Sequence, residues 1–126
     1  MILIQPEEIR AKRAGLIDRK LKALGVSTAT VNIDGPRFDP MVMQELTHIA
    51  VVNKTNGYTR LRIGTWDGAS FHVLTEETSP TEDTYYFSGD DFLVPPGSRI
   101  RAELTGTVTG DDLRLVLNGV WVKLKE

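Results

Sequence analysis

From residue 26 onward, apolar residues recur at every second position in short runs, and glycine, proline, asparagine or aspartate separates one run from the next. A period of two is the repeat of a β-strand with one buried face, whereas a helix repeats every 3.6 residues. Short strands at regular spacing are typical of sandwiches and jelly rolls. The sequence therefore predicts a mainly β protein, an antiparallel, jelly-roll-like β-sandwich of roughly seven to nine strands.

Two turn signals organise the middle of the chain. The Asn-Gly pair at 56–57 has the composition of a hairpin turn between strands over 44–55 and 58–66. The Asp-Gly pair at 67–68 predicts a second hairpin directly afterwards. Together these turns predict a three-strand meander.

A Pro-Pro-Gly run at 95–97 stands directly before the alternating segment 98–104. Proline lacks the N–H that a sheet ladder needs and fixes φ, so it is confined to strand ends and sheet edges. The run therefore predicts a corner at which the chain leaves one sheet and enters the other.

The last strand region contains an Asn-Gly break at 118–119, which is either a hairpin turn or a bulge in one long strand. A hairpin would set Arg114 opposite Lys123, so a single bulged strand is favoured. With Val120 and Val122 pointing inward after the break, and Leu61 and Ile63 inward on their own strand, we expect Trp66, Trp121 or both to face outward.

The beginning of the chain follows another period. Over residues 6–24 the apolar positions fall on one side of a helical wheel, and Gly25 supplies a stop signal. Gly15 costs such a helix about 1 kcal/mol relative to alanine, so the helix needs a surface to lie on. We therefore predict an N-terminal segment 1–25 with an amphipathic helix, preceding a sandwich domain over 26–126. The helix docking face consists of Ile9, Leu16, Ile17, Leu21 and Leu24, and an apolar N-terminal strand consists of Ile2, Leu3 and Ile4.

Few residues suggest chemistry. The chain has no cysteine, and its only histidines, His48 and His72, lack the spacing of a zinc site. No G-x-S-x-G motif accompanies them. The acidic pairs at 90–91 and 111–112 follow glycine, which is typical of turns, with calcium binding as the alternative. We therefore expect no catalytic residue, no metal and no cofactor.

The net charge and hydropathy of the chain limit the classes of partner that it is expected to bind. A net charge of −2 and a pI near 5.7 make nucleic acid an improbable main ligand. The apolar runs are too short for a membrane span, and the first ten residues lack the features of a signal peptide. We therefore expect synthesis and folding in the cytoplasm. Three aromatic residues, Trp66, Tyr86 and Trp121, form the candidate platform for a stacked ligand or a protein partner.

Residues from about 44 to 124 resemble small β-sandwich virion proteins of tailed bacteriophages. The shared features are a strand ending in Val-Asn before a turn, a Pro-Gly corner before an Arg-alternating strand, and a Gly-Asp turn before a strand with Gly-aromatic. The resemblance implies a structural part, present in many symmetric copies, that decorates the head or joins head to tail. The matching segments read HIAVVNKTNGYTRLRIGTWDG and FLVPPGSRIRAELTGTVTGDDLRLVLNGVWV.

These observations favour a non-enzymatic structural protein of a tailed-phage virion, assembled in the host cytoplasm. We expect a homo-oligomer that docks through residues 1–25 or through a sheet edge, because uncovered sheet edges favour pairing with other chains. The expected neighbours are capsid, portal or neck proteins of the same virion. The alternative is a carbohydrate- or receptor-binding module that uses Trp66, Tyr86 or Trp121.

Overall fold

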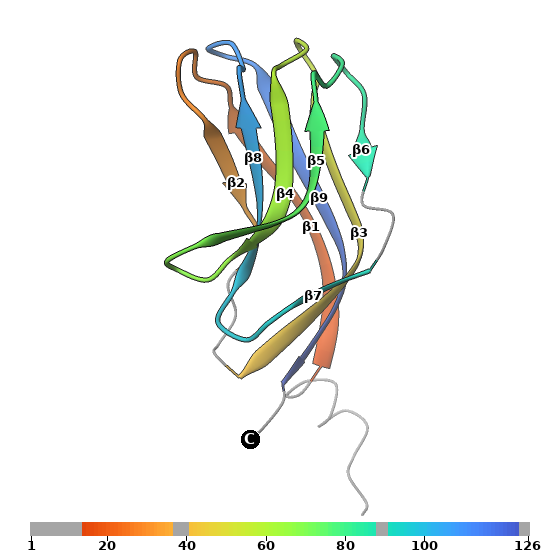
Figure 1. Cartoon of the computed structure of the whole chain (residues 1–126). Coiled ribbons are helices and arrows are strands. Elements are labelled where there is room, and N and C mark those ends of the chain that lie inside the picture. Colours follow the sequence, from red (N-terminus) through yellow and green to blue (C-terminus); the bar gives the residue numbers. More distant parts are fainter. Residues whose placement is uncertain (1–13, 37–40, 88–90, 124–126) are drawn as a thin grey trace, which may run out of the picture.

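The computed structural model describes residues 14–36, 41–87 and 91–123, which form nine strands in two antiparallel sheets (Figure 1). The first sheet contains, in spatial order, β1 (Ala14–Leu24), β9 (Asp112–Lys123) and β3 (Val42–Asn53), followed by β6 (Tyr86–Phe87) and β7 (Phe92–Val94), which both pair with β3. The second sheet has the order β2 (Val31–Asp34), β8 (Arg99–Thr105), β4 (Arg60–Trp66) and β5 (Phe71–Thr78).

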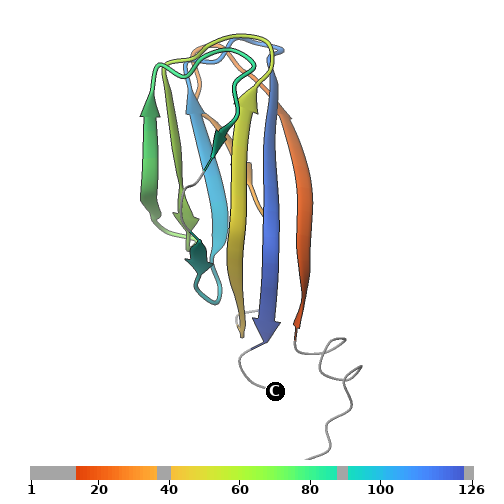
Figure 2. The same cartoon turned by 90° about the vertical axis from the view of Figure 1, so that its right-hand side faces the viewer.

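The strand pairing is nested. β1 pairs with β9, β2 with β8, β3 with β6 and β7, and β4 with β5, as if one long hairpin were folded into two layers. The β3·β9 and β4·β8 pairs complete the two sheets. This nesting is the connectivity of a jelly roll, and the two layers are visible in Figure 2. The predicted β-sandwich is confirmed.

The core lies between the two sheets. Alternate residues of each long strand point inward, which is the pattern that the period of two predicts. The first sheet contributes Leu46, Ile49, Val51, Leu113, Leu115 and Leu117, and the second contributes Leu61, Ile63, Ile100, Ala102 and Leu104, all at most 2% exposed. Each such leucine or isoleucine stabilises the fold by roughly 1.5–3 kcal/mol through burial alone.

The predicted N-terminal helix is wrong. Residues 14–24 form β1, whose eleven residues all pair with β9, and no residue in the described part of the chain is helical. Ile17 and Leu21 are four residues apart, a spacing that fits one face of a helix and also one face of a strand. Pairing with β9 decides between the two periods, because it satisfies the backbone along the whole strand. Residues 6–13 of the predicted helix lie outside the described residues.

The predicted three-strand meander is also wrong in its first half. β3 and β4 belong to different sheets, so the Asn-Gly pair at 56–57 lies in a loop that crosses between them. The Asn53 side-chain oxygen accepts hydrogen bonds from the backbone N–H groups of Thr55 and Asn56 and shapes that loop. The second hairpin, at 67–68, is confirmed as the β4–β5 connection, with Gly68 at φ 98°.

The Pro-Pro-Gly corner is confirmed. It connects β7 in the first sheet to β8 in the second. Gly97 has a φ of 83°, and the N–H of Ser98 donates to the carbonyl of Pro95 at 3.1 Å. A left-handed residue is needed here, and glycine adopts that conformation without steric cost.

The final region is one long strand, as favoured, but the bulge lies in its neighbour. The β3·β9 register shifts between Leu46 and His48, so that Thr47 is the extra residue. Gly119 lies beside this bulge, where a Cβ would collide with the backbone of Glu45 and Leu46. Because β9 itself keeps its alternation, Trp121 has the inward parity of Leu117, and the expectation that Val120 and Val122 point inward is wrong. Of the two tryptophans, Trp66 is the one that faces outward.

Asp111 holds together the loops at one end of the sandwich. Its carboxylate is 1% exposed and accepts hydrogen bonds from Asn53 Nδ2 at 2.9 Å, Asn56 Nδ2 at 2.6 Å and the Val108 N–H at 2.8 Å. Burial raises the pKa of Asp111, but the three hydrogen bonds outweigh burial and hold that pKa below its ordinary value. The turn role expected for the 111–112 pair is what Asp111 performs.

Replacing Asp111 with alanine leaves these donors without a partner in a buried site. We expect Asp111→Ala to lower the free energy of unfolding by about 3 kcal/mol, as measured by urea denaturation. Asp83→Asn is the matched control, because the Asp83 side chain is 59% exposed and forms a surface ion pair with Lys54, and asparagine tolerates the positive φ of 52° at this position. Equal effects of the two substitutions would contradict a structural role for the Asp111 hydrogen bonds.

Candidate interaction surface

One end of the outer face of the first sheet carries apolar side chains from four strands, with the exposed Glu45 among them. In one cross-strand row Leu16 lies opposite Val120, and Val120 opposite Glu45, which pairs in turn with Leu93. The next row runs from Ala14 through Val122 to Met43. We call Ala14, Leu16, Met43, Leu93, Val120 and Val122 the outer apolar patch; Leu16 is 84% exposed, Leu93 62% and Val122 43%.

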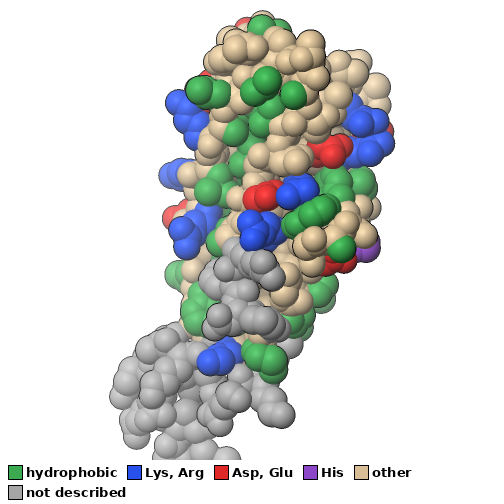
Figure 3. Space-filling model, turned by 90° about the vertical axis from the view of Figure 1, so that its left-hand side faces the viewer, with side chains coloured by type: hydrophobic (Ala, Val, Ile, Leu, Met, Phe, Trp, Pro, Cys, Tyr) green, Lys and Arg blue, Asp and Glu red, His purple; other side chains and the backbone are tan. Residues whose placement is uncertain are grey.

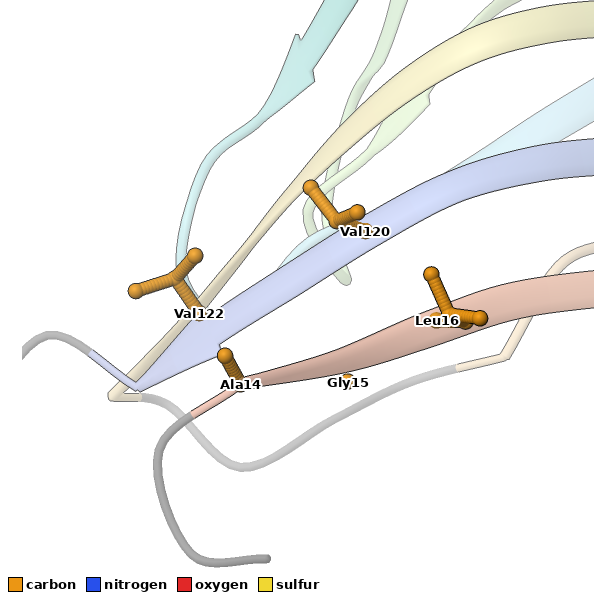
Figure 4. Close-up of a pocket in the computed structure, with 5 residues that line it drawn as sticks. All are labelled: Ala14, Gly15, Leu16, Val120 and Val122. Atoms are coloured by element: carbon orange, nitrogen blue, oxygen red, sulfur yellow. The ribbon is translucent and has the colours of Figure 1, made fainter. Parts of the chain in front are cut away.

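The patch contains a shallow hollow of about 390 Å³, lined by Ala14, Gly15, Leu16, Val120 and Val122. Figure 4 shows the side chains of β1 and β9 beside one another around it. Gly15 lies over the indole of Trp121, and a Cβ at this position would collide with that ring. The hollow offers apolar atoms and shape but no group able to perform chemistry, which suits contact with another apolar surface.

Beyond the patch the same face becomes polar. Asn118 Nδ2 donates to Asp18 Oδ1 at 3.1 Å and marks the boundary. Further along, Arg114 forms a bidentate pair with Asp112, with N–O distances of 2.9 and 3.1 Å, and Lys22 lies 4.0 Å from the same carboxylate. The hydrogen bonds from Arg114 lower the pKa of Asp112. The outer face is therefore divided into an apolar half and a charged half.

The predicted docking residues are divided between two faces. Ile17 is 3% exposed within the core, and Leu21 packs against that core. Leu16 and Leu24 point outward, at 84% and 60% exposure. Ile9 of the predicted helix face, and Ile2, Leu3 and Ile4 of the predicted N-terminal strand, lie outside the described residues. The sequence signal for the patch is the alternate apolar residues Ala14 and Leu16 on one strand and Val120 and Val122 on another.

The outer face of the second sheet carries a charged network around Trp66. Arg101 donates to both carboxylate oxygens of Asp34, at 2.7 and 3.0 Å, and its guanidinium lies 4.1 Å from the centroid of the Trp66 ring. Arg62 donates to Glu76 at 2.8 Å on the same face. Acidic, basic and hydrophobic side chains are interspersed on the side of the sandwich where β2 lies (Figure 3). The arginines of this network are therefore paired with carboxylates of the same sheet.

The three candidate aromatic residues do not form one platform. Trp66 faces outward from the second sheet but is covered by Arg101. Tyr86 packs against the core, and its hydroxyl oxygen accepts a hydrogen bond from the Thr81 N–H at 2.7 Å. Trp121 packs against the core from the first sheet. A sugar or base stacked on one of these rings would not reach the other two.

His72 and Asp67 form the pair that most resembles catalytic machinery. They lie at the exposed β4–β5 hairpin, with His72 Nε2 2.9 Å from Asp67 Oδ2. Because an ionised carboxylate can only accept, Nε2 donates. The other Asp67 oxygen accepts from the N–H groups of Ala69 and Ser70, both at 2.8 Å, so the carboxylate stabilises the turn. His48 lies on β3, far along the sequence and in the other sheet.

Neither a metal centre nor a membrane helix is found among the described residues. No cluster of three or more histidine, aspartate or glutamate side chains there could hold a metal ion. No helix in that part of the chain has the length and apolar character needed to cross a membrane.

Comparisons with known proteins identify no family. No protein-family model matches the sequence, and no curated protein matches it. Structures of infectious bursal disease virus, of the Gx and Gt strains, contain similar chains with TM-scores of 0.45 and 0.37 and 11% sequence identity. Each match covers 86% of this chain and 32% of the viral chain. These neighbours are from a virus but not from a tailed phage, and at this level of similarity they do not determine the function.

The hydrogen bond from His72 and those from the turn backbone lower the pKa of Asp67 to about 2. We expect NMR titration of this carboxyl group to give a midpoint near that value, and His72→Ala to move it toward 3.8, the ordinary value. Since the folded pKa is depressed, the contribution of Asp67 to stability is present above pH 3.8 and is lost as the pH falls through 2. An unchanged midpoint in His72→Ala would contradict the pairing.

Proposed function

We propose that this chain is a non-enzymatic structural protein of a tailed-phage virion, which self-associates and contributes to head decoration or to the head–tail joint. Its neighbours in this proposal are further copies of itself and the capsid, portal or neck proteins. The observation that carries the proposal is the outer apolar patch on a sheet whose other face is already committed to the core.

The patch supports assembly because exposed apolar area across several strands is stabilised by covering it. Single exposed leucines are ordinary, but Leu16 lies directly opposite Val120 and Ala14 opposite Val122, and Leu93 follows beyond Glu45 in the row of Leu16. An exposed apolar sheet face can be covered by a second sheet packed about 10 Å away, as sheets pack in sandwiches.

The rival proposal, a carbohydrate- or receptor-binding module, has less support. Jelly rolls are used by both viral capsid and lectin domains, so the fold alone does not choose between these functions. A sugar site needs an aromatic face that a ring can reach, whereas the arginine over Trp66 occupies that face. The surface therefore favours assembly over sugar binding.

The non-enzymatic part of the proposal rests on what Asp67 and His72 do. Asp67 is engaged with its own turn, and within the described residues no serine hydroxyl is hydrogen-bonded to His72. A nucleophile–base–orienting-group arrangement would need that contact.

Placing a charge in the patch should weaken self-association. We expect Leu16→Asp to raise the dissociation constant of the oligomer at least about tenfold, because the covered leucine contributes roughly 1.5–3 kcal/mol and a buried carboxylate is unfavourable. Light scattering over a concentration series measures this change. Leu74→Asp is the matched control, because Leu74 is 50% exposed on the second sheet.

A full-length chain that is monomeric at every concentration and absent from particles would overturn the proposal. The viral part has its own readout: quantitative mass spectrometry of purified particles should find the chain in many copies. A detectable but strongly substoichiometric amount would contradict a repeated structural role.

A further inference from the structure

The four sheet edges of the sandwich differ greatly in their capacity to pair with another chain. β2 has four residues, and β6 and β7 have two and three. β5 has eight residues, but its register to β4 is interrupted between Ile63 and Gly64, and it carries two adjacent glutamates. Short strands, bulges and like charges are devices that prevent edge pairing.

β1 carries three cationic residues, Arg19, Lys20 and Lys22, and Arg19 has the inward parity of Ile17, but β1 is neither short nor bulged. It has eleven residues and no proline, and its register to β9 is continuous from Ala14 to Leu24. One side of its backbone is paired with β9, and no strand of the described residues pairs with the other side. Among the edges of the described chain, β1 therefore offers the longest uninterrupted template for an added strand.

One acidic and one basic side chain on the outer face of β1 are spaced so that they can pair with an antiparallel copy of the strand. Its outward-facing side chains include Asp18, Lys20 and Lys22, and Lys20 has no ion-pair partner among the described residues. We infer that two copies of this chain pair antiparallel along β1, with Arg19 on the two-fold axis, to form one continuous sheet across the dimer. This inference rests on the self-association in the proposed function and specifies one interface for it.

The register follows from the charges of opposite side chains and from the face of the sheet on which each side chain lies. With Arg19 opposite Arg19, Asp18 of each copy lies opposite Lys20 of the other, so one attractive pair occurs twice. On the inner side Ile17 lies opposite Leu21, again twice. All eleven residues of β1 are paired, from Ala14 to Leu24.

Other registers are less favourable. Sliding one strand by a single residue along the other would place an outward-facing side chain opposite an inward-facing one. Directly opposite residues of two antiparallel strands lie on the same face of a sheet, so such a register does not form. Centring on Asp18 opposes two carboxylates. Centring on Lys20 opposes two ammonium groups and leaves Ala14 and Gly15 without partners within the strand. The Arg19 register has its own like-charge pair on the inner side, but Arg19 is exposed and its long side chain can reach solvent.

Cysteine scanning tests the register, because the chain contains no cysteine of its own. Directly opposite Cα atoms in antiparallel strands are about 4.5–5.5 Å apart, a distance that a disulfide can span. Under mild oxidation, full-length Arg19→Cys should form a covalent dimer on a non-reducing gel. Leu16→Cys and Lys20→Cys, which are also exposed on β1, should remain at background. Preferential crosslinking at either control position would overturn the inference.

Charge exchange provides a test that does not depend on disulfides. Asp18→Lys or Lys20→Asp alone turns both attractive pairs repulsive, and each should weaken dimerisation by about tenfold in light scattering. The double variant Asp18→Lys/Lys20→Asp restores the pairs and should restore the dimer. Circular dichroism confirms that each variant is folded. Failure of the double variant to recover would overturn the register.

The outcomes separate this inference from the proposed function. If the full chain self-associates and Leu16→Asp disrupts it, but Arg19→Cys does not crosslink, assembly through the patch stands and the β1 pairing is wrong. If the full chain never self-associates, both are wrong.

Discussion

The structure depends on the central position of β9 in the first sheet. This strand donates and accepts backbone hydrogen bonds on both sides, to β1 and to β3, while Leu113, Leu115 and Leu117 enter the core beneath it. A segment from the very end of the described chain thereby holds one from its beginning. The same pairing decides that residues 14–24 are extended, places Trp121 under Gly15, and brings Val120 and Val122 beside Leu16.

The sequence predicted those parts of the fold that depend on local chemistry. The alternation within strands, the corner at 95–97 and the hairpin at 67–68 each follow from residues that are adjacent in the chain. The predictions were wrong where a segment far away in the sequence determines the local structure. The apolar residues of 14–24 fit both the helical and the strand period, and pairing with β9 is what makes this segment extended. The Asn-Gly pair at 56–57 has the composition of a hairpin turn, but Asn56 is hydrogen-bonded to Asp111, which is far away in the sequence.

The candidate surface was predictable only in part, for the same reason. Leu16 was identified as an interface residue, but on a helix whose other members included the core residue Ile17. The patch combines four strands, so its membership requires the registers and not only the pattern. Trp121 shows the limit clearly, because a bulge in β3, invisible in the sequence of β9, removes the need for any break at Gly119.

That bulge also fixes the length of β3. Before Thr47 the even-numbered residues Val42 and Leu46 point inward, and after it the odd-numbered Ile49 and Val51 do. The extra residue is what allows one strand to bury both sets. Loss of a single residue there would exchange the inward-facing and outward-facing side chains over half of the strand. Loops elsewhere can change length without altering which side chains reach the core. Related chains should therefore vary in their connections while this segment keeps a constant number of residues.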